Sequence, residues 1–345
     1  MTGKWDYKGH GEAEARDMTS RERFRETMRY GMPDRVPYFE EGLRDDVLAE
    51  WHKQGLPPDA DLAAMFHVDA RERMPVNIEP IPPMERPLTT REDFLELRLR
   101  LDPDDAKRLP DDWPARVAAW RTREHVLELQ LHRGFFLSMG VRDARTFDPV
   151  VYLLHDDPRL VHDTLNLYSD FGARLAERIL HEVDVDCAIF SEPIGGNDRP
   201  LLSPETYGRF VLSSYRPILD AARRGGVGTL VYMTYANARP LLPGVVRAGF
   251  ECLWACEVNV EAMDYLSLRR RFGRDLRLIG GIDLDTLLED KAAIRREMER
   301  VIPPLLAQGG YIPLADGRVR ANVPFDNYRY YRELLEQLTR RRGGE

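Results

Sequence analysis

The sequence predicts an α/β protein built as a single (β/α)8 barrel with a helical extension at its N-terminal side. Short apolar runs that end in polar loops alternate along the chain with segments of helical periodicity. About eight such runs can be counted, and the order strand, loop, helix repeats as it does in a parallel barrel. The length of 345 residues is enough to bury the core of one such barrel.

The helical extension is expected over 18–31, where a Ser/Thr cap precedes a charged first turn and apolar residues at helical spacing. The expected strands cover residues 35–41, 74–80, 126–131, 187–192, 229–235, 250–257, 275–283 and 311–316. In the fifth of these, Met233 and Tyr235 alternate with Tyr232, so Met233 and Tyr235 share one face and Tyr232 lies on the other.

Composition excludes several classes of function. A formal net charge of -8 argues against a nucleic-acid partner, which needs a clustered basic face. The three cysteines have no zinc-ribbon or CxxC spacing, which indicates a reduced, cytoplasmic protein. No apolar run reaches membrane-spanning length, so no membrane partner is expected. We expect a disordered leader over 1–17, the barrel over 18–340 and a short tail over 341–345, and the sequence leaves a homodimer open.

Acidic residues stand at the ends of five expected strands: Glu40 or Glu41, Glu192, Glu257, Asp283 and Asp316. Because parallel strands of a barrel all end at the same rim, these carboxyl groups are expected to converge on one mouth. Neighbouring carboxylates in a dry site repel each other, which can raise the pKa of one of them into the range of a general acid. For Asp283, a helix cap is an equally good interpretation.

Histidine and cysteine residues offer few metal ligands. His132 and Arg133 end the third expected strand, and His132 is the one histidine that we place at the rim. No histidine follows His181, so the C-terminal half cannot supply an H-x-C or H-x-H site. Cys252 and Cys256 share a strand face and are interpreted as small buried hydrophobic residues.

Several stretches of the chain resemble the uroporphyrinogen decarboxylase superfamily, which includes the porphyrinogen decarboxylases and the corrinoid-linked methyltransferases. The similar text is TSRERFRETMRYGMPDRVPYFEEG, FSEPIGGNDRPLLSPETYGRFVLSSYRPI, NARPLLPGVVRAGF, LIGGIDLDTL and GGYIPLADGRVRANVPFDNYRYYRELL. The resemblance implies a TIM barrel with its site at the C-terminal mouth.

The sequence also departs from both branches of that superfamily. In the methyltransferase branch, Met233 and Tyr235 stand where zinc ligands are expected, and both are poor ligands for zinc. Glu257 and Asp316 match acidic positions of related sequences, whereas Gly317 stands where many carry histidine. In the decarboxylase branch, a segment like FMRQAGRY would grip propionate groups. Here the text is PYFEEGLRDD, whose acids would repel a polycarboxylate porphyrinogen.

On this resemblance we expect an enzyme that transfers a methyl group from a small molecule without a bound zinc ion, and the sequence leaves open a metal held by carboxylates alone. It has no tightly bound cofactor, and a corrinoid carried by a partner protein is the implied acceptor. Glu192 or Tyr235 would donate a proton to the leaving atom, and Glu257 and Asp316 would orient or deprotonate it. The expected substrate-binding residues are His132, Arg133, Tyr232, Met233, Asn237, Asp283 and Arg318.

Two alternatives remain open at this point. The first is a cofactor-free decarboxylase of a small acid, in which a guanidinium holds the carboxylate. The candidates for that guanidinium are Arg133, Arg239, Arg318 and Arg320. The second is a barrel that binds a ligand or partner without catalysis, since the usual metal-ligand types are missing. The fold does not choose among them, because this barrel supports many chemistries.

Overall fold

The computed structural model describes residues 17–257 and 262–340. Its strands are β1 (Arg71–Arg73), β2 (Val126–His132), β3 (Cys187–Glu192), β4 (Leu230–Thr234), β5 (Cys252–Ala255), β6 (Arg277–Ile279) and β7 (Tyr311–Ile312). The α-helices are α1 (Ser20–Met28), α2 (Val47–Lys53), α3 (Leu62–Met65), α4 (Arg91–Arg100), α5 (Trp113–Trp120), α6 (Phe135–Ser138), α7 (Ala144–Asp156), α8 (Pro158–Leu180), α9 (Pro204–Thr206), α10 (Ser213–Arg224), α11 (Leu242–Ala248), α12 (Tyr265–Phe272), α13 (Lys291–Leu306) and α14 (Phe325–Thr339). Shorter helical turns are η1 (Ala106–Arg108), η2 (Tyr207–Leu212, a π-helical turn), η3 (Gly273–Asp275) and η4 (Leu284–Leu288).

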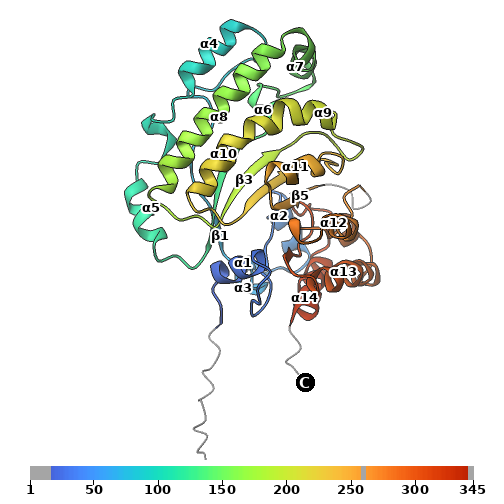
Figure 1. Ribbon diagram of the computed structural model, residues 1–345. Helices are drawn as coiled ribbons and strands as arrows, with labels where there is room; N and C mark the ends of the chain where they lie inside the picture. Colours follow the sequence, from blue (N-terminus) through green and yellow to red (C-terminus); the bar gives the residue numbers. More distant parts are fainter. Residues whose placement is uncertain (1–16, 258–261, 341–345) are drawn as a thin grey trace, which may run out of the picture.

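The strands form one curled parallel sheet in the order β1 to β7, so every strand lies beside its neighbour in the sequence. Figure 1 shows this sheet at the centre, with α8 and α10 on one side of the molecule and α12, α13 and α14 on the other. Each connection between strands carries at least one helix or helical turn, as parallel strands require. The α/β class is therefore confirmed, and the described strands number seven rather than eight.

The first expected strand, 35–41, is wrong: the structure forms no strand there. Pro37 lacks an N–H, so an unbroken ladder cannot run through this segment. Its neighbour Tyr38 bonds to Asp69 instead, accepting from the backbone N–H of Asp69 at 2.9 Å and donating to its carboxylate at 2.7 Å. Further along, an isolated parallel bridge joins Leu43 to Val319. The segment thus lies between the two edges of the sheet without regular pairing.

The second expected strand, 74–80, is also misplaced. The strand at this position is β1, which ends at Arg73, just before Met74 and Pro75. Pro75 cannot donate to a ladder, which ends the pairing. The sequence of β1 is Arg-Glu-Arg, and charged residues of this kind have low strand propensity, so the pattern of apolar runs did not indicate it. The other six expected strands correspond to β2 through β7.

Buried residues form two clusters. The larger packs the outer face of the sheet against the helices. The smaller fills the inside of the curled sheet, and its members are Phe24, Met28, Phe39, Val126, Cys187, Ile189, Val231, Met233, Cys252, Trp254, Cys256, Ile279, Ile312 and Leu314. The inner cluster therefore identifies the side chains that point into the barrel, which decides what can reach the mouth.

Helix α1 closes the end of the barrel opposite the mouth. The predicted cap is confirmed: Thr19 and Glu22 form a capping box, and Phe24 and Met28 belong to the inner cluster. Arg21 and Arg25 of α1 each form ion pairs with both Asp184 and Asp186, which lie directly before β3. The four N–O distances are between 2.5 and 3.0 Å. These pairs hold α1 across the N-terminal ends of the strands.

Two remaining expectations concern the ends of the chain and membranes. The predicted leader, apart from Asp17, and the predicted tail at 341–345 lie outside the described residues. Among the residues that the structure describes, no helix is both long and apolar enough to cross a membrane.

Candidate functional site

A cavity of about 250 Å³ opens at the C-terminal ends of the strands. Its lining residues are Asn197, Glu257, Asp283, Leu284, Asp285, Asp316 and Arg320. They follow β3, β5, β6 and β7, so four strand ends meet here. The expected convergence of acids is confirmed for Glu257, Asp283 and Asp316, and we call this cavity and the adjoining barrel interior the mouth.

Asp316 is the most buried of the acids that line the cavity. Its Oδ1 accepts a hydrogen bond of 2.8 Å from the backbone N–H of Gly281. Burial raises the pKa of this carboxyl well above its ordinary value, so Asp316 favours the protonated form. Gly280 makes the close approach possible: a Cβ at this position would lie 2.2 Å from Asp316 Oδ1, and its φ of +105° suits glycine.

The other three acids of the cavity, Glu257, Asp283 and Asp285, are more exposed. Glu257 forms an ion pair of 3.0 Å with Arg44, and its backbone has a φ of +52°. Asp283 caps η4 by accepting from the backbone N–H of Asp285 at 2.9 Å, so the capping interpretation is confirmed. Burial raises the pKa of Asp283, although Asp283 also lines the cavity. The Asp283 carboxyl therefore both caps η4 and lines the cavity.

Tyr235 stands at the edge of the mouth with 39% of its surface exposed. Met233 is a member of the inner cluster, and the Tyr235 hydroxyl lies 4.0 Å from its sulfur, so the two residues share a face as predicted. Burial raises the pKa of Tyr235, and electrostatic interaction with the neighbouring Cys256 and Glu41 groups adds to the rise. The Tyr235 hydroxyl therefore keeps its proton and can donate a hydrogen bond at the solvent-exposed edge of the mouth.

The interior next to β1 carries charged residues that the sequence analysis missed. Arg71 and Arg73 point inward with Glu128 of β2, at 3.2 Å and 3.5 Å from its carboxylate oxygens. Arg71 also lies over the Trp254 ring at 4.9 Å and donates to the backbone carbonyl of Glu40. Glu128 gave a signal, because it is the one acidic residue of strand β2, where it lies between two leucines.

Glu41 joins this interior group, whereas Glu40 does not. Cys256 Sγ lies 3.3 Å from Glu41 Oε1, and burial raises the pKa of the Glu41 carboxyl while Arg71 opposes the rise. Glu40 instead bonds to the buried guanidinium of Arg332, on α14. Of the two adjacent acids, Glu41 is thus the one that faces the mouth.

The structure places Glu192 away from the mouth. Its side chain is fully buried and points from β3 toward the helices, where it accepts from Phe135 N at 2.9 Å, from Tyr207 at 3.2 Å and from Tyr215. Burial raises the pKa of Glu192 to about 7. The expected position beside a ligand-admitting loop is wrong, because the strand alternation turns this residue outward. We call Glu192 with Tyr207, Tyr215 and Tyr232 the tyrosine cluster.

Two predicted substrate-binding residues belong to the same buried region. Tyr232 is fully buried and lies 3.1 Å from the Tyr207 hydroxyl, on the face opposite Met233. His132 packs 4.6 Å from the Tyr215 ring, and its Nδ1 accepts from Gly134 N at 2.9 Å. Burial lowers the pKa of His132 to about 3, so it stays neutral. Neither side chain reaches the mouth in this structure.

The remaining predicted residues have structural partners or lie in solvent. Arg133 forms an ion pair with Glu79. Asn237 ties two loops together, because its backbone N–H donates to Gly196 and its side-chain amide donates to Asp198 at 3.2 Å. Arg318 is exposed. Of the residues predicted to bind substrate, Met233 and Asp283 are the ones that the structure brings to the mouth.

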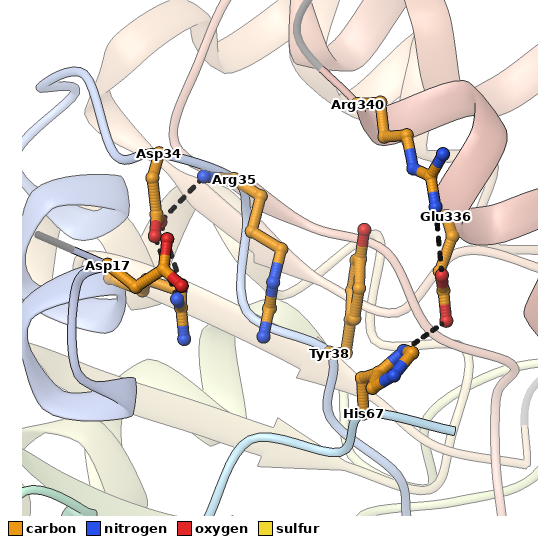
Figure 2. A pocket seen from close by; sticks show the side chains of 8 residues that line it. Asp17, Asp34, Arg35, Tyr38, His67, Glu336 and Arg340 are labelled. Atoms are coloured by element: carbon orange, nitrogen blue, oxygen red, sulfur yellow. Dashed lines mark hydrogen bonds and ion pairs between the residues drawn. The ribbon is translucent and has the colours of Figure 1, made fainter. Parts of the chain in front are cut away.

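A larger cavity, of about 630 Å³, lies at the opposite end of the barrel beside α1 and α14. Figure 2 shows its charged side chains paired with one another. His67 and Arg340 approach Glu336 at 2.8 Å and 3.7 Å, and Arg23 binds Asp34 at 2.7 Å. Its charges are thus largely compensated internally.

The residues at the mouth do not fit a zinc ion. Met233 offers a buried thioether and Tyr235 a protonated phenol, neither of which is a usual zinc donor. Within the described ranges, no three His, Cys, Asp or Glu side chains lie together in a way that could hold a metal. No chemical step is therefore assigned to zinc.

The sequence of this chain matches a known family over its larger part. The model of the family described as uroporphyrinogen decarboxylase (URO-D) matches residues 137–337, which is more than half of the chain. The chain belongs to the URO-D family. The matched part contains Tyr235, Glu257 and Asp316, whereas Arg73 and Glu128 of this URO-D protein lie before it. No curated protein matches the sequence.

Solved structures show the same fold. A methyltransferase from Methanosarcina mazei is 14% identical, with a TM-score of 0.59 over 92% of this chain and 99% of that one. This likeness shows the URO-D-like TIM-barrel fold and, at that identity, the fold alone. Two weaker matches carry the provisional names lyase/mutase, from Burkholderia cenocepacia (13% identity, TM-score 0.29, 75% and 72% of the two chains), and vitamin-B12 independent methionine synthase, from Listeria monocytogenes (11%, 0.36, 87% and 94%). Their TM-scores are too low to support an argument.

Proposed function

We propose that this URO-D family protein transfers a methyl group from a small O-methylated molecule to a corrinoid carried by a partner protein, without a bound zinc ion. The observation that carries the proposal is that two possible proton donors follow strands at the same end of the sheet: Tyr235, partly exposed after β4, and buried Asp316, which lines the cavity after β7. A methyl transfer of this kind leaves an oxygen anion, which needs a proton or a hydrogen-bond donor. The fold shared with a methyltransferase is consistent with it.

The proposed reaction breaks the bond between the methyl carbon and its oxygen. The methyl group moves without the bonding electron pair, which remains on the oxygen. The reduced corrinoid supplies the electron pair for the new bond to carbon. Tyr235 donates a hydrogen bond to the leaving oxygen, and Asp316 supplies the proton that neutralises it. Glu257, held by Arg44 at 3.0 Å, orients the substrate from the open side.

The test is an anaerobic assay with 2-methoxyphenol and reduced cobalamin, in which chromatography measures the release of catechol. We expect wild-type turnover, and a loss of about 10²- to 10⁴-fold in Asp316→Asn, as is typical for removal of a general acid. Tyr235→Phe should lower the rate as well. Tyr152→Phe is the matched control, because Tyr152 is exposed on α7. Full activity of both mouth variants would contradict the assigned roles.

Decarboxylation of a small acid is the second candidate, and the Arg73 guanidinium at the mouth favours it. In that reaction the bond to the carboxyl carbon breaks, carbon dioxide leaves, and the electron pair stays on the remaining carbon. Asp316 would then protonate that carbon. Release of carbon dioxide without transfer of a methyl group, measured with labelled aromatic acids, would favour this candidate over the first. A barrel that only binds its ligand would give neither product.

A further inference from the structure

Arg73 lies at the mouth with most of its hydrogen-bonding capacity unused among the described residues. Its side chain is 43% exposed, and its contact is one oxygen of Glu128 at 3.5 Å. A guanidinium carries several N–H donors in a planar fork that matches a carboxylate. We propose that Arg73 binds a carboxylate of the substrate, so that the small molecule taken by this mouth is an organic acid. The inference rests on the proposed function in placing the substrate at the same mouth.

The neighbouring Arg71 also forms an ion pair with Glu128. Arg71 approaches the other carboxylate oxygen of Glu128 at 3.2 Å, donates to a backbone carbonyl and stacks on Trp254. One carboxylate therefore serves two guanidinium groups. Arg73, the more exposed of the two, is the one whose charge is left for a ligand.

The nearby acids have raised pKa values or other partners. Burial raises the pKa of Glu41 and raises that of Asp316 well above its ordinary value. Glu257 is paired with Arg44 instead. Two guanidinium groups thus share Glu128 beside β1, while the cavity lined by acids lies on the side of β5 to β7. An anionic end of a ligand belongs beside β1, since like charges repel it on the other side.

The surroundings also limit the ligand to a small, partly apolar molecule. Tyr235 follows β4 on the face of Met233, with its hydroxyl 4.0 Å from the Met233 sulfur, so it borders the same interior. Met233 and Trp254 are paired in register on adjacent strands and form the apolar wall below. The indole N–H of Trp254 is buried and has no acceptor among the described residues. An aromatic carboxylic acid has the anionic end and the flat apolar body that these groups fit.

The test is a calorimetric titration without any methyl acceptor, using 3-methoxybenzoate and its neutral analogue 3-methoxybenzyl alcohol as probes. We expect wild-type protein to bind the acid at least about tenfold more tightly than the alcohol. Arg73→Gln should weaken binding of the acid by about 10- to 100-fold and leave binding of the alcohol nearly unchanged. Arg73→Lys should fall between, because it keeps the charge and loses the fork. Arg216→Gln, exposed on α10, is the matched control.

Equal affinity of wild type and Arg73→Gln for the acid would overturn the proposal, as would equal affinity of wild type for acid and alcohol. Failure of wild type to bind the acid at millimolar concentration would overturn it too. Melting temperatures establish that the variants fold, and Arg73→Lys keeps the test valid if Arg73→Gln does not. The outcome is separable from the proposed function. Loss of acid binding in Arg73→Gln supports the site even if no methyl transfer occurs, and turnover of neutral donors with equal acid binding supports methyl transfer alone.

Discussion

Glu192 should make the stability of the folded protein depend on pH, because it is a fully buried carboxyl group. Burial raises the pKa of Glu192 from 4.5 to about 7. The folded state therefore binds the proton more tightly than the unfolded chain does. The stabilisation from this group is complete below the unfolded pKa and is lost as the pH rises through the folded value. At about 1.4 kcal/mol per pKa unit, the whole effect is about 3 kcal/mol.

Glu192→Gln removes this titration while keeping the size of the side chain. We expect wild-type stability, measured by urea unfolding, to fall by about 2 to 3 kcal/mol more than that of the variant between about pH 5 and about pH 8. Glu205→Gln, which changes an exposed acid at α9, controls for the loss of one acidic residue. Turnover should remain near that of wild type, because Glu192 does not reach the mouth.

The same dependence of stability on pH in wild type and Glu192→Gln would refute this account of the tyrosine cluster. A stable Glu192→Gln protein that binds ligand but has lost its activity would contradict the structural role given to Glu192. That result would show that Glu192 acts in catalysis after all, and that the buried arrangement is not the working one.

Three further predictions concern the rest of the molecule. Gly280→Ala should lower stability by roughly 1 to 3 kcal/mol and impair any activity, because its Cβ would meet Asp316 Oδ1; an unchanged melting temperature and rate would contradict this. Arg123→Ala should cost about 1 to 2 kcal/mol, because buried Asp186 loses one of its three guanidinium partners, at 3.1 Å, and keeps Arg21 and Arg25; exposed Arg121→Ala serves as its control in thermal melting. Elemental analysis of the purified protein should find no stoichiometric zinc; one zinc ion per chain at the mouth would contradict the argument from the donor set.

The sequence predicted the elements whose signals are local. Strands β3, β4 and β5 follow apolar runs, and the capping box at Thr19 is written in four consecutive residues. The segments 35–41 and 74–80 were misassigned because their hydrogen-bond partners lie far away in the chain and because each contains a proline. Regular pairing there depends on tertiary contacts that composition does not encode.

The residues of the candidate site also fall into those that local sequence signals predicted and those that depend on tertiary contacts. Glu257 and Asp316 were found because strand ends of a barrel share a rim. Glu192 was expected to face the mouth, but its side chain points to the other face of the sheet. The side chains of Cys187 and Ile189 point inward, so strand alternation implies that Glu192 points outward. Arg73 was missed because its strand was expected at 74–80, whereas β1 covers Arg71–Arg73. Charged residues within a short strand become informative when the partner strand is known, as with Glu128.

Helix α1 closes the barrel interior at the end opposite the mouth, so the interior is open at one end. Phe24 and Met28 fill its base, so molecules that react inside enter and leave on the side of the mouth. For a reaction between a small molecule and a group carried by a large partner, this geometry imposes an order. The small molecule must already be seated when the partner covers the opening, and the partner must withdraw before the product can escape. Turnover would then be limited by how long the partner stays, and a partner that binds too tightly would slow the enzyme.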